Sequence, residues 1–233
     1  MTEQEEVLSG LKTIHARIKN ACEKAARAEN EVKLLLATKT VPAEKIRFAI
    51  NAGETLIGEN HVQEYAEKYE ALKDLDCERH FIGHLQTNKI KDVLKYVSCI
   101  QSVDSINLAE KLDYRLQQEG KSINIYVQVN TSFEESKFGV EPDNAFNLIK
   151  RINQLDSLKI KGLMTIGLLS EDETMVKKSY RLLREIRDRA IAEALLPADC
   201  KELSMGMSHD LDWAIAEGAT MVRVGTAIFG KRN

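Results

Sequence analysis

One lysine of this sequence stands where a β-strand would end and a turn would begin. Lys39 follows the apolar run 33–38 (KLLLAT) and precedes the turn into Pro42. By the two-residue period of a strand, Leu35, Ala37 and Lys39 share one side. Most of the 33 Lys and Arg residues are expected on the solvated surface. A lysine in a partly apolar mouth, however, has its charged form disfavoured, and the neutral amine can form a Schiff base with an aldehyde.

Two segments near the end of the sequence carry groups suited to binding an anion. In SMGMSHD, Ser204, Gly206 and Ser208 alternate toward one side, and Ser208 also occupies the expected N-cap position of a helix. In VRVGTAIFG, Gly225 and Thr226 are expected to open a short helix, where glycine allows the backbone to approach a phosphate. Helix capping alone would explain Ser208, but the two segments together favour a phosphate site.

Arg223 is expected to point toward the protein interior, because it shares a side of its strand with Met221 and Gly225. A buried arginine needs hydrogen-bond acceptors, since the guanidinium group only donates. No acidic residue lies beside Arg223 in the sequence. An atom of a bound ligand is therefore a candidate acceptor.

The segments that carry these residues belong to a regular alternation of short apolar runs and amphipathic stretches. Such an alternation predicts parallel β–α–β units, and an amphipathic helix at about residues 3–28 precedes them. Strands are expected at 33–38, 55–59, 80–83, 99–103, 123–130, 161–167, 202–206 and 221–225. Helices are expected at 42–53, 62–72, 88–96, 105–119, 142–155 and 209–217, with a long one opened by a capping box from Ser170 to Glu173.

Eight such units favour an α/β fold of the (β/α)8 TIM-barrel type, with the N-terminal helix added and residues 1–233 forming one domain. The strand INIYVQVN at 123–130 alternates apolar and polar residues, so one face meets helices while the polar face is enclosed. A barrel lumen accounts for that pattern better than an open sheet with two apolar faces, which remains the alternative. In a barrel, Lys39 and the two anion-binding segments lie at the same mouth.

Composition excludes several other classes of function. A formal net charge of −3 gives no electrostatic case for nucleic acid or an anionic membrane surface as partner. No run approaches the roughly 20 apolar residues of a membrane span, and the first residues lack the apolar core of a signal peptide, so we expect a cytoplasmic protein. The four cysteines form no Cys-x-x-Cys pair, and His80 and His84 fall on a strand and a loop, so no metal site is expected.

Several blocks of the sequence resemble one known family. They are LLLATKT, IGENHVQE, HFIGHLQTNK, VNTSFEESKFG, GLMTIG and LSMGMSHDLDWAIAEGATMVRVGTAIFG, and they run from about residue 33 to 230. Together they are similar to the pyridoxal phosphate homeostasis protein family. Its members are single-domain barrels related to the N-terminal domain of alanine racemase, of pyridoxal phosphate fold type III.

The resemblance implies a cofactor and a set of residues that would hold it. The cofactor is pyridoxal 5'-phosphate (PLP), bound as a Schiff base to the lysine that matches Lys39, with Arg223 facing the pyridine nitrogen. The phosphate would lie among the residues that match Ser208, Gly225 and Thr226, with Ser204 as a further candidate. Asn60 and His84 would line the pocket of the ring.

Physical reasoning gives this implied site a limited chemistry. An arginine at the pyridine nitrogen only donates, so it keeps that nitrogen unprotonated and weakens the ring as an electron sink. The sequence ends at Asn233, so we expect no second domain like the one that supplies a tyrosine base in alanine racemase, and none of the six tyrosines lies beyond Tyr180. We therefore expect a non-catalytic protein of intracellular PLP (vitamin B6) homeostasis, with PLP-dependent apo-enzymes as acceptors.

Two alternatives remain open. One is a weakly active PLP-dependent amino-acid racemase, whose turnover would be lost with Lys39. The other is an aldolase-like barrel that uses Lys39 on a phosphorylated sugar, and such an enzyme would show no cofactor absorbance.

Overall fold

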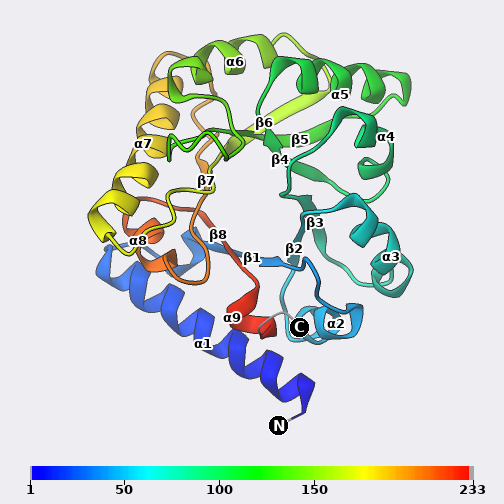
Figure 1. The fold of residues 1–233 in the computed structure, drawn as a ribbon, viewed down its shortest axis with the longest axis vertical. Helices are drawn as coiled ribbons and strands as arrows, with labels where there is room; N and C mark the ends of the chain where they lie inside the picture. The colour runs from blue at the N-terminus through cyan, green and yellow to red at the C-terminus, as the bar shows by residue number, and fades with distance from the viewer. Residues whose placement is uncertain (1, 231–233) are drawn as a thin grey trace.

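Eight parallel strands close into a barrel in the computed structural model, which describes residues 2–230 (Figure 1). Each strand pairs with the next, and β8 returns to pair with β1, so that Leu35 lies opposite Arg223. The expected TIM barrel is thereby confirmed, and the open sheet is wrong. The strands are β1 (Lys33–Ala37), β2 (Leu56–Glu59), β3 (Glu78–Phe81), β4 (Cys99–Val103), β5 (Ile123–Gln128), β6 (Leu158–Met164), β7 (Glu202–Ser204) and β8 (Met221–Val224).

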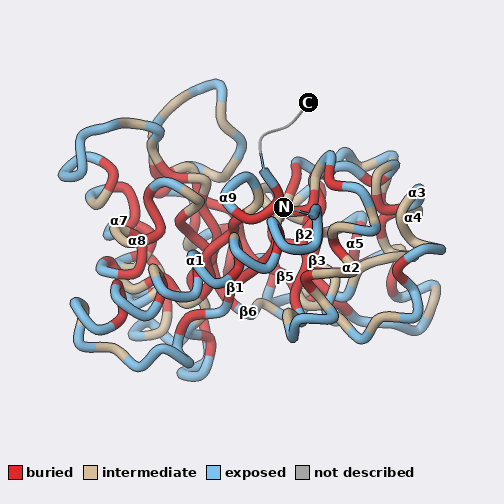
Figure 2. The backbone as a smooth tube through the Cα atoms, turned by 90° about the horizontal axis from the view of Figure 1, so that it is seen from below, coloured by how far each residue is buried: buried red, intermediate tan, exposed pale blue. Residues whose placement is uncertain are grey.

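Helices surround the strands on the outside of the barrel (Figure 1). Buried residues are concentrated in the strands and on the inner sides of the helices, whereas the outer turns are exposed (Figure 2). Within residues 2–230 the α-helices are α1 (Glu3–Lys24), α2 (Ala43–Asn51), α3 (Val62–Leu72), α4 (Ile90–Val93), α5 (Ile106–Gln118), α6 (Ala145–Ile152), α7 (Glu173–Ala192), α8 (Leu211–Ala216) and α9 (Thr226–Phe229). No helix of this described part is long and apolar enough to cross a lipid bilayer.

The N-terminal helix α1 forms because its apolar residues recur on one face and its first turn is capped. The Thr2 hydroxyl accepts from the Glu5 N–H while the Glu5 carboxylate accepts from the Thr2 N–H, which completes a capping box. The apolar face packs against α8 and α9, the two helices that flank β8 (Figure 1). The helix ends at Lys24 rather than near residue 28, since Ala26 adopts a left-handed φ of 52°.

The interior of the barrel matches the pattern found in strand β5. Ile125 and Val127 belong to the core between the strands and the helices. Tyr126 belongs instead to a separate buried cluster inside the barrel, together with Leu35 and Met221. The alternation of apolar and polar residues in β5 is therefore the alternation between the helix-facing side and the lumen.

Several element boundaries differ from expectation. Strand β6 begins at Leu158 and ends at Met164, three residues earlier at each end than the expected 161–167. Helix α7 begins at Glu173 with Asp172 as its N-cap, so the capping box expected from Ser170 is wrong. The expected helix at 88–96 is a 3-10 turn followed by the short α4. These differences arise because hydrogen-bonding side chains and tertiary packing decide ends that periodicity leaves open.

Candidate functional site

A cavity of about 700 Å³ opens at the carboxyl ends of the strands. Parallel strands deliver the residues that follow them to one rim, so segments far apart in the sequence meet there. Apolar walls come from Ile82 after β3 and Ile166 after β6, which strand periodicity places on the lumen side. Six of the eight predicted site residues line this cavity: Lys39, Asn60, Ser208, Arg223, Gly225 and Thr226.

Lys39 lies two residues beyond the end of β1 and is half-buried at the cavity wall. The following residue, Thr40, has a left-handed φ of 61°, which turns the chain away from the strand direction. The Thr40 N–H donates to a carboxylate oxygen of Glu64 on α3 at 2.5 Å. The turn that presents Lys39 is therefore fixed by a side chain from a neighbouring helix, and not by the sequence of the turn alone.

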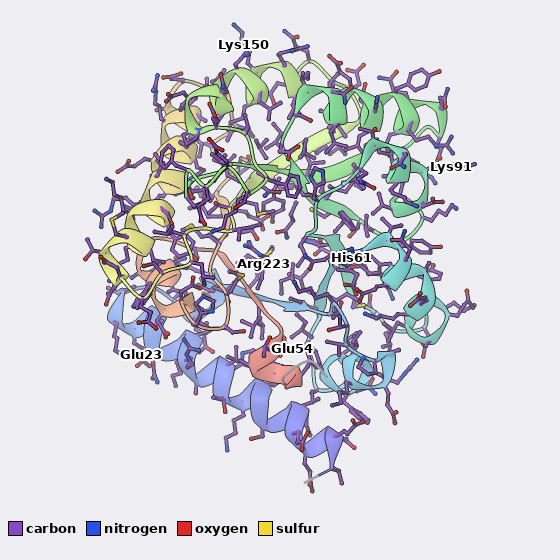
Figure 3. All side chains as sticks on the ribbon, in the orientation of Figure 1. Glu23, Glu54, His61, Lys91, Lys150 and Arg223 are labelled. Atoms are coloured by element: carbon purple, nitrogen blue, oxygen red, sulfur yellow. The ribbon has the colours of Figure 1, made fainter. Side chains whose placement is uncertain are left out.

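Arg223 points from β8 into the barrel interior (Figure 3). Its Nη1 donates to the backbone oxygen and the hydroxyl of Ser204, each at 2.7 Å, and its Nη2 donates to the Thr165 backbone oxygen at 2.7 Å. The protein itself therefore supplies acceptors, which the sequence did not reveal. Burial lowers the pKa of Arg223 because the charged form loses water, and the electrostatic influence of Tyr180 and Asp210 opposes that change.

Ser204 is fully buried beneath Arg223 and is not among the described residues that line the cavity. Its hydroxyl donates to the Gln101 side-chain oxygen at 2.6 Å and accepts from Arg223. The structure thus separates Ser204 from Ser208, Gly225 and Thr226. Ser204 contacts the guanidinium group of Arg223 from outside the lining of the cavity.

The start of α9 lies at the cavity wall, where Gly225 and Thr226 were expected to open a short helix. A Cβ atom at Gly225 would lie 2.7 Å from the Ala37 backbone oxygen, so only glycine lets β8 end this close to β1. The short helix then begins at Thr226, whose side chain is exposed at the cavity. The first N–H groups of a helix have no partner within the helix and attract anions.

Ser208 does not cap a helix, because α8 begins only at Leu211 with Asp210 as its N-cap residue. The expected N-cap role is therefore wrong, although Ser208 does lie in the cavity wall. The Asp210 carboxylate accepts from the Met207 N–H at 2.7 Å and so closes the turn around Ser208. Arg17 of α1 donates to the Ser208 backbone oxygen at 2.6 Å. This contact ties the N-terminal helix to the cavity.

His84 lies in a second cavity of about 480 Å³. It shares Asn60, Ile82 and Ile166 with the cavity that contains Lys39, which is called the main cavity below. Its ring stacks on Phe138 with centroids 3.6 Å apart. A Cβ atom at Gly83 would lie 2.1 Å from the Asn60 backbone oxygen, so glycine at 83 allows Asn60 to reach the wall between the two cavities. The structure therefore brings Asn60 to the main site and leaves His84 beside it.

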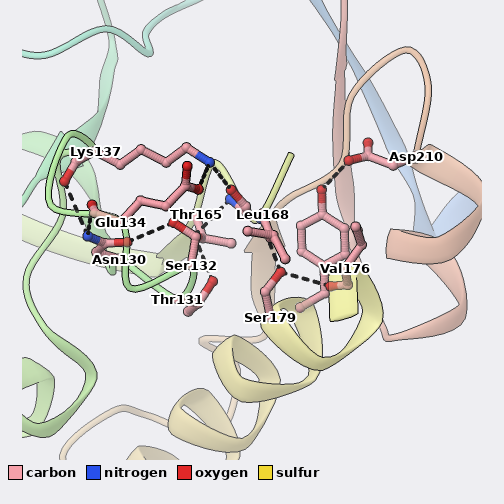
Figure 4. A network of polar contacts seen from close by, with 12 residues as sticks. Asn130, Thr131, Ser132, Glu134, Lys137, Thr165, Leu168, Val176, Ser179 and Asp210 are labelled. Carbon is pink, nitrogen blue, oxygen red and sulfur yellow. Dashed lines mark hydrogen bonds and ion pairs between the residues drawn. The ribbon is translucent and has the colours of Figure 1, made fainter. Parts of the chain in front are cut away.

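A network of polar contacts joins the loops that follow β5, β6 and β7 (Figure 4). The hydroxyls of Thr131 and Thr165 lie 3.0 Å apart, and Lys137 donates to the Gly167 backbone oxygen at 2.8 Å. Tyr180 of α7 donates to the Asp210 carboxylate at 2.7 Å. These residues carry no shared sequence pattern, so sequence analysis missed them. Their contacts stiffen the rim next to the cavity.

The described residues 2–230 contain no group of three or more His, Cys, Asp and Glu side chains placed to hold a metal ion. The chemistry at the mouth instead rests on the amines of Lys39 and Lys45, the buried guanidinium group of Arg223 and a set of neutral donors. This donor set suits an anionic ligand that also carries an aldehyde, because an amine can bond to the aldehyde carbon.

The fold and the site define a barrel of the alanine racemase N-terminal-domain class. Residues 11–233 match the sequence profile of the family described as alanine racemase, N-terminal domain. The solved alanine racemase of Clostridium difficile 630 shares the fold, with a TM-score of 0.74 at 16% identity, covering 96% of this chain and 55% of that chain.

Two further relatives are more similar in sequence. The pyridoxal phosphate homeostasis protein of Aquifex aeolicus is 48% identical, over 96% of this chain and 97% of that protein. The structure of PipY from Synechococcus elongatus with PLP bound has a TM-score of 0.80 at 33% identity, covering 92% of this chain and 100% of that chain. The chain belongs to the pyridoxal phosphate homeostasis protein family.

Proposed function

We propose that this protein binds PLP in the main cavity through a Schiff base on Lys39. The observation that carries the proposal is the convergence of Lys39, Arg223 and the start of α9 on one cavity. PLP would supply an aldehyde for the amine, a pyridine nitrogen for a donor and a phosphate for a helix start. The structure of the relative PipY with PLP bound supports PLP as the ligand.

Each residue has a separate part in holding the cofactor. Lys39 provides the amine nitrogen that bonds to the aldehyde carbon, with the aldehyde oxygen leaving as water. Arg223 holds a donor toward the pyridine nitrogen and stays protonated while doing so. Ser208, Gly225 and Thr226 hold the phosphate through hydroxyl and backbone donors, and Asn60 lines the ring pocket with His84 beside it. Ser204 acts on Arg223 rather than on the phosphate.

A matched pair of lysine variants tests this assignment. We expect the purified protein to show a visible absorbance band with PLP, which borohydride bleaches while fixing PLP to Lys39. Lys39→Arg keeps the positive charge but has no amine that can bond to an aldehyde, so the band should disappear. Lys45→Arg is the control, because Lys45 also lines the cavity but pairs with Glu3 at 3.1 Å.

Two results would contradict the assignment. A wild-type protein that stays colourless after incubation with PLP removes the proposed function. A peptide map that finds the reduced adduct on Lys45 leaves PLP binding intact and removes Lys39 as the attachment point.

We further propose that the protein holds PLP without turning over a substrate of its own. Racemisation needs a second base across the ring from the lysine, and the described residues lining the cavity include no tyrosine. Tyr126 and Tyr180 are buried and donate to Glu202 and Asp210. Burial raises the pKa of both tyrosines well above the usual value for a phenol, so neither is a source of a phenolate base.

An assay of amino-acid racemisation separates carrier from enzyme. We expect the same background rate for the wild type and Lys39→Ala. A wild-type rate on the order of 1 per second, abolished in Lys39→Ala, would identify a racemase instead.

The cellular role follows from reversible binding. In this proposal the protein holds PLP in the cytoplasm and releases it to PLP-dependent apo-enzymes. Mixing the loaded protein with such an apo-enzyme should restore its activity in the presence of a scavenger that destroys free PLP. Recovery no greater than that from the same amount of free PLP would argue against direct transfer. The cytoplasmic location stays a prediction, which cell fractionation tests.

A further inference from the structure

A chain of polar side chains runs through the barrel interior from Arg223 to the opposite end. Arg223 Nη1 lies 2.7 Å from the Ser204 hydroxyl, which lies 2.6 Å from Gln101 Oε1. Gln101 Nε2 lies 2.6 Å from His80 Nδ1, and His80 Nε2 lies 2.8 Å from a carboxylate oxygen of Glu78. The chain therefore joins strands β8, β7, β4 and β3 across the lumen.

The environment of the chain changes along its length. Ser204, Gln101 and His80 are 0%, 0% and 2% exposed, so each of their hydrogen bonds must be satisfied inside the protein. The side chain of Glu78 is 49% exposed and lines a smaller cavity of about 260 Å³ at the amino-terminal end of the barrel. The hydrogen bond from His80 lowers the pKa of Glu78 and keeps it a carboxylate. The chain begins at a buried cation and ends at an anion near solvent.

That terminal carboxylate fixes the direction of every hydrogen bond before it. An ionised Glu78 only accepts, so His80 carries a hydrogen on Nε2, and in the neutral ring that leaves Nδ1 as an acceptor. Gln101 must then donate from Nε2, which leaves Oε1 to accept from the Ser204 hydroxyl. Because the Ser204 hydrogen points toward Gln101, a lone pair of the same oxygen is free to accept from Arg223.

Reversing the direction of these hydrogen bonds would change the acceptor that Ser204 offers to Arg223. If His80 Nδ1 carried the hydrogen, the Gln101 amide would turn over and its Nε2 would donate to Ser204. The Ser204 oxygen would then accept from both Gln101 and Arg223, and its own hydrogen would have no place in the chain. The direction set by Glu78 is therefore the one that leaves Ser204 best suited to hold the guanidinium group.

We propose that Gln101 and His80 are positioning residues that fix the guanidinium group of Arg223 toward the ring nitrogen of PLP. Neither is among the described residues that line the main cavity. The proposal rests on the proposed function, because it concerns the same cofactor. The proposal gives the polar interior of the barrel a part in PLP binding. If that interior had only a structural role, changes in it would alter the folding stability alone.

Gln101→Met tests the centre of the chain, since methionine has a similar length but neither donates as an amide nor accepts as a carbonyl. We expect PLP affinity to fall about tenfold, as when an outer partner of a binding residue is lost, together with a shift of the visible absorbance maximum of the bound cofactor. Glu202→Gln is the matched control. Glu202 is a carboxylate in the same small cavity, but it pairs with Lys33 and Tyr126 outside the chain.

Glu78→Lys tests the direction of the chain from its exposed end, where the fold tolerates substitution. A lysine donates where the carboxylate accepted, so the Gln101 amide should turn over and PLP affinity should fall as in Gln101→Met. Unchanged affinity and absorbance in folded Gln101→Met and Glu78→Lys would overturn the proposal. An equal loss of affinity in Glu202→Gln would also overturn it, because a general effect of the lumen on stability would then explain the result.

A measurement on the protein without PLP keeps this inference separate from the proposed function. Long-range ¹H–¹⁵N NMR spectra of the histidine rings distinguish the two tautomers, and we expect His80 with its hydrogen on Nε2 in the wild type. A hydrogen on Nδ1 would overturn the chain even if PLP binds. Failure of the wild type to bind PLP would remove the proposed function, while the tautomer of His80 would still decide whether the chain has the direction inferred here.

Discussion

The sharpest test of phosphate recognition is removal of one hydroxyl group, in Thr226→Ala. Thr226 is the first residue of α9, it lines the main cavity and its side chain is exposed. An exposed substitution of this kind changes folding stability by only about 0.5 kcal/mol or less. A change in ligand affinity would therefore report on the ligand contact and not on the barrel.

The expected magnitude follows from the charge of the phosphate. A hydrogen bond to a charged group contributes about 1.5–3 kcal/mol, and about 1.4 kcal/mol corresponds to a factor of ten in affinity. Thr226→Ala should thus raise the dissociation constant for PLP roughly 10- to 100-fold. Thr226→Ser retains the hydroxyl group and should stay close to the wild type.

Titration with PLP and with pyridoxal, followed by visible absorbance, separates the phosphate contact from the ring contacts. Pyridoxal lacks the phosphate, so it should bind weakly to the wild type and should lose no further affinity in Thr226→Ala. If both ligands lose affinity equally, the hydroxyl group of Thr226 does not contact the phosphate. If neither loses affinity, the start of α9 serves the fold alone.

Three further predictions concern buried groups. Arg223→Lys keeps a cation but loses the planar group that reaches Ser204 and the Thr165 carbonyl, so PLP affinity measured by titration should fall about tenfold; unchanged affinity would contradict this. Tyr180→Phe removes the donor to one oxygen of the buried Asp210 carboxylate, whose other oxygen still accepts from the Met207 N–H, and should lower the free energy of unfolding in urea by about 1–3 kcal/mol; a loss confined to the measurement error would refute that contact. Burial raises the pKa of Glu59 above its ordinary 4.5, although the bond from Lys68 lowers it. The stability that protonation of Glu59 contributes is therefore complete below its ordinary pKa and is lost as the pH rises through the raised value. Over that range the free energy of unfolding of the wild type should fall relative to that of Glu59→Gln; a constant difference would show that Glu59 titrates alike in both states.

Local sequence patterns predicted the number and order of the strands, because the two-residue and 3.6-residue periods are properties of each segment alone. The alternation at 123–130 also predicted an enclosed polar face, which Tyr126 and Gln128 occupy in the structure. Boundaries were less well predicted. Strand β6 begins three residues early and α8 starts beyond Ser208, since hydrogen bonds such as the one between Asp210 and Met207 decide where an element begins.

Six of the eight predicted site residues line one cavity. Strand ends and glycine positions pointed to Lys39, Gly225 and Thr226, and the barrel brings all three to one cavity. Ser204, considered for the phosphate, is buried and does not line this cavity, because period two places a residue on the lumen side without saying how deep in the lumen it lies. The Ser204 hydroxyl contacts Arg223.

The sequence by itself determined the succession of strands and helices, the residues at the strand ends and the family of the protein. Each of these depends on patterns within short continuous segments of sequence. Only the tertiary structure decided that β8 pairs with β1 and that Thr165 and Ser204 provide acceptors for Arg223. The physical reason is that closure and register act between strands far apart in the sequence. They set which lumen side chains lie at hydrogen-bond distance. They therefore also set the direction of the hydrogen bonds that run from Arg223 to Glu78.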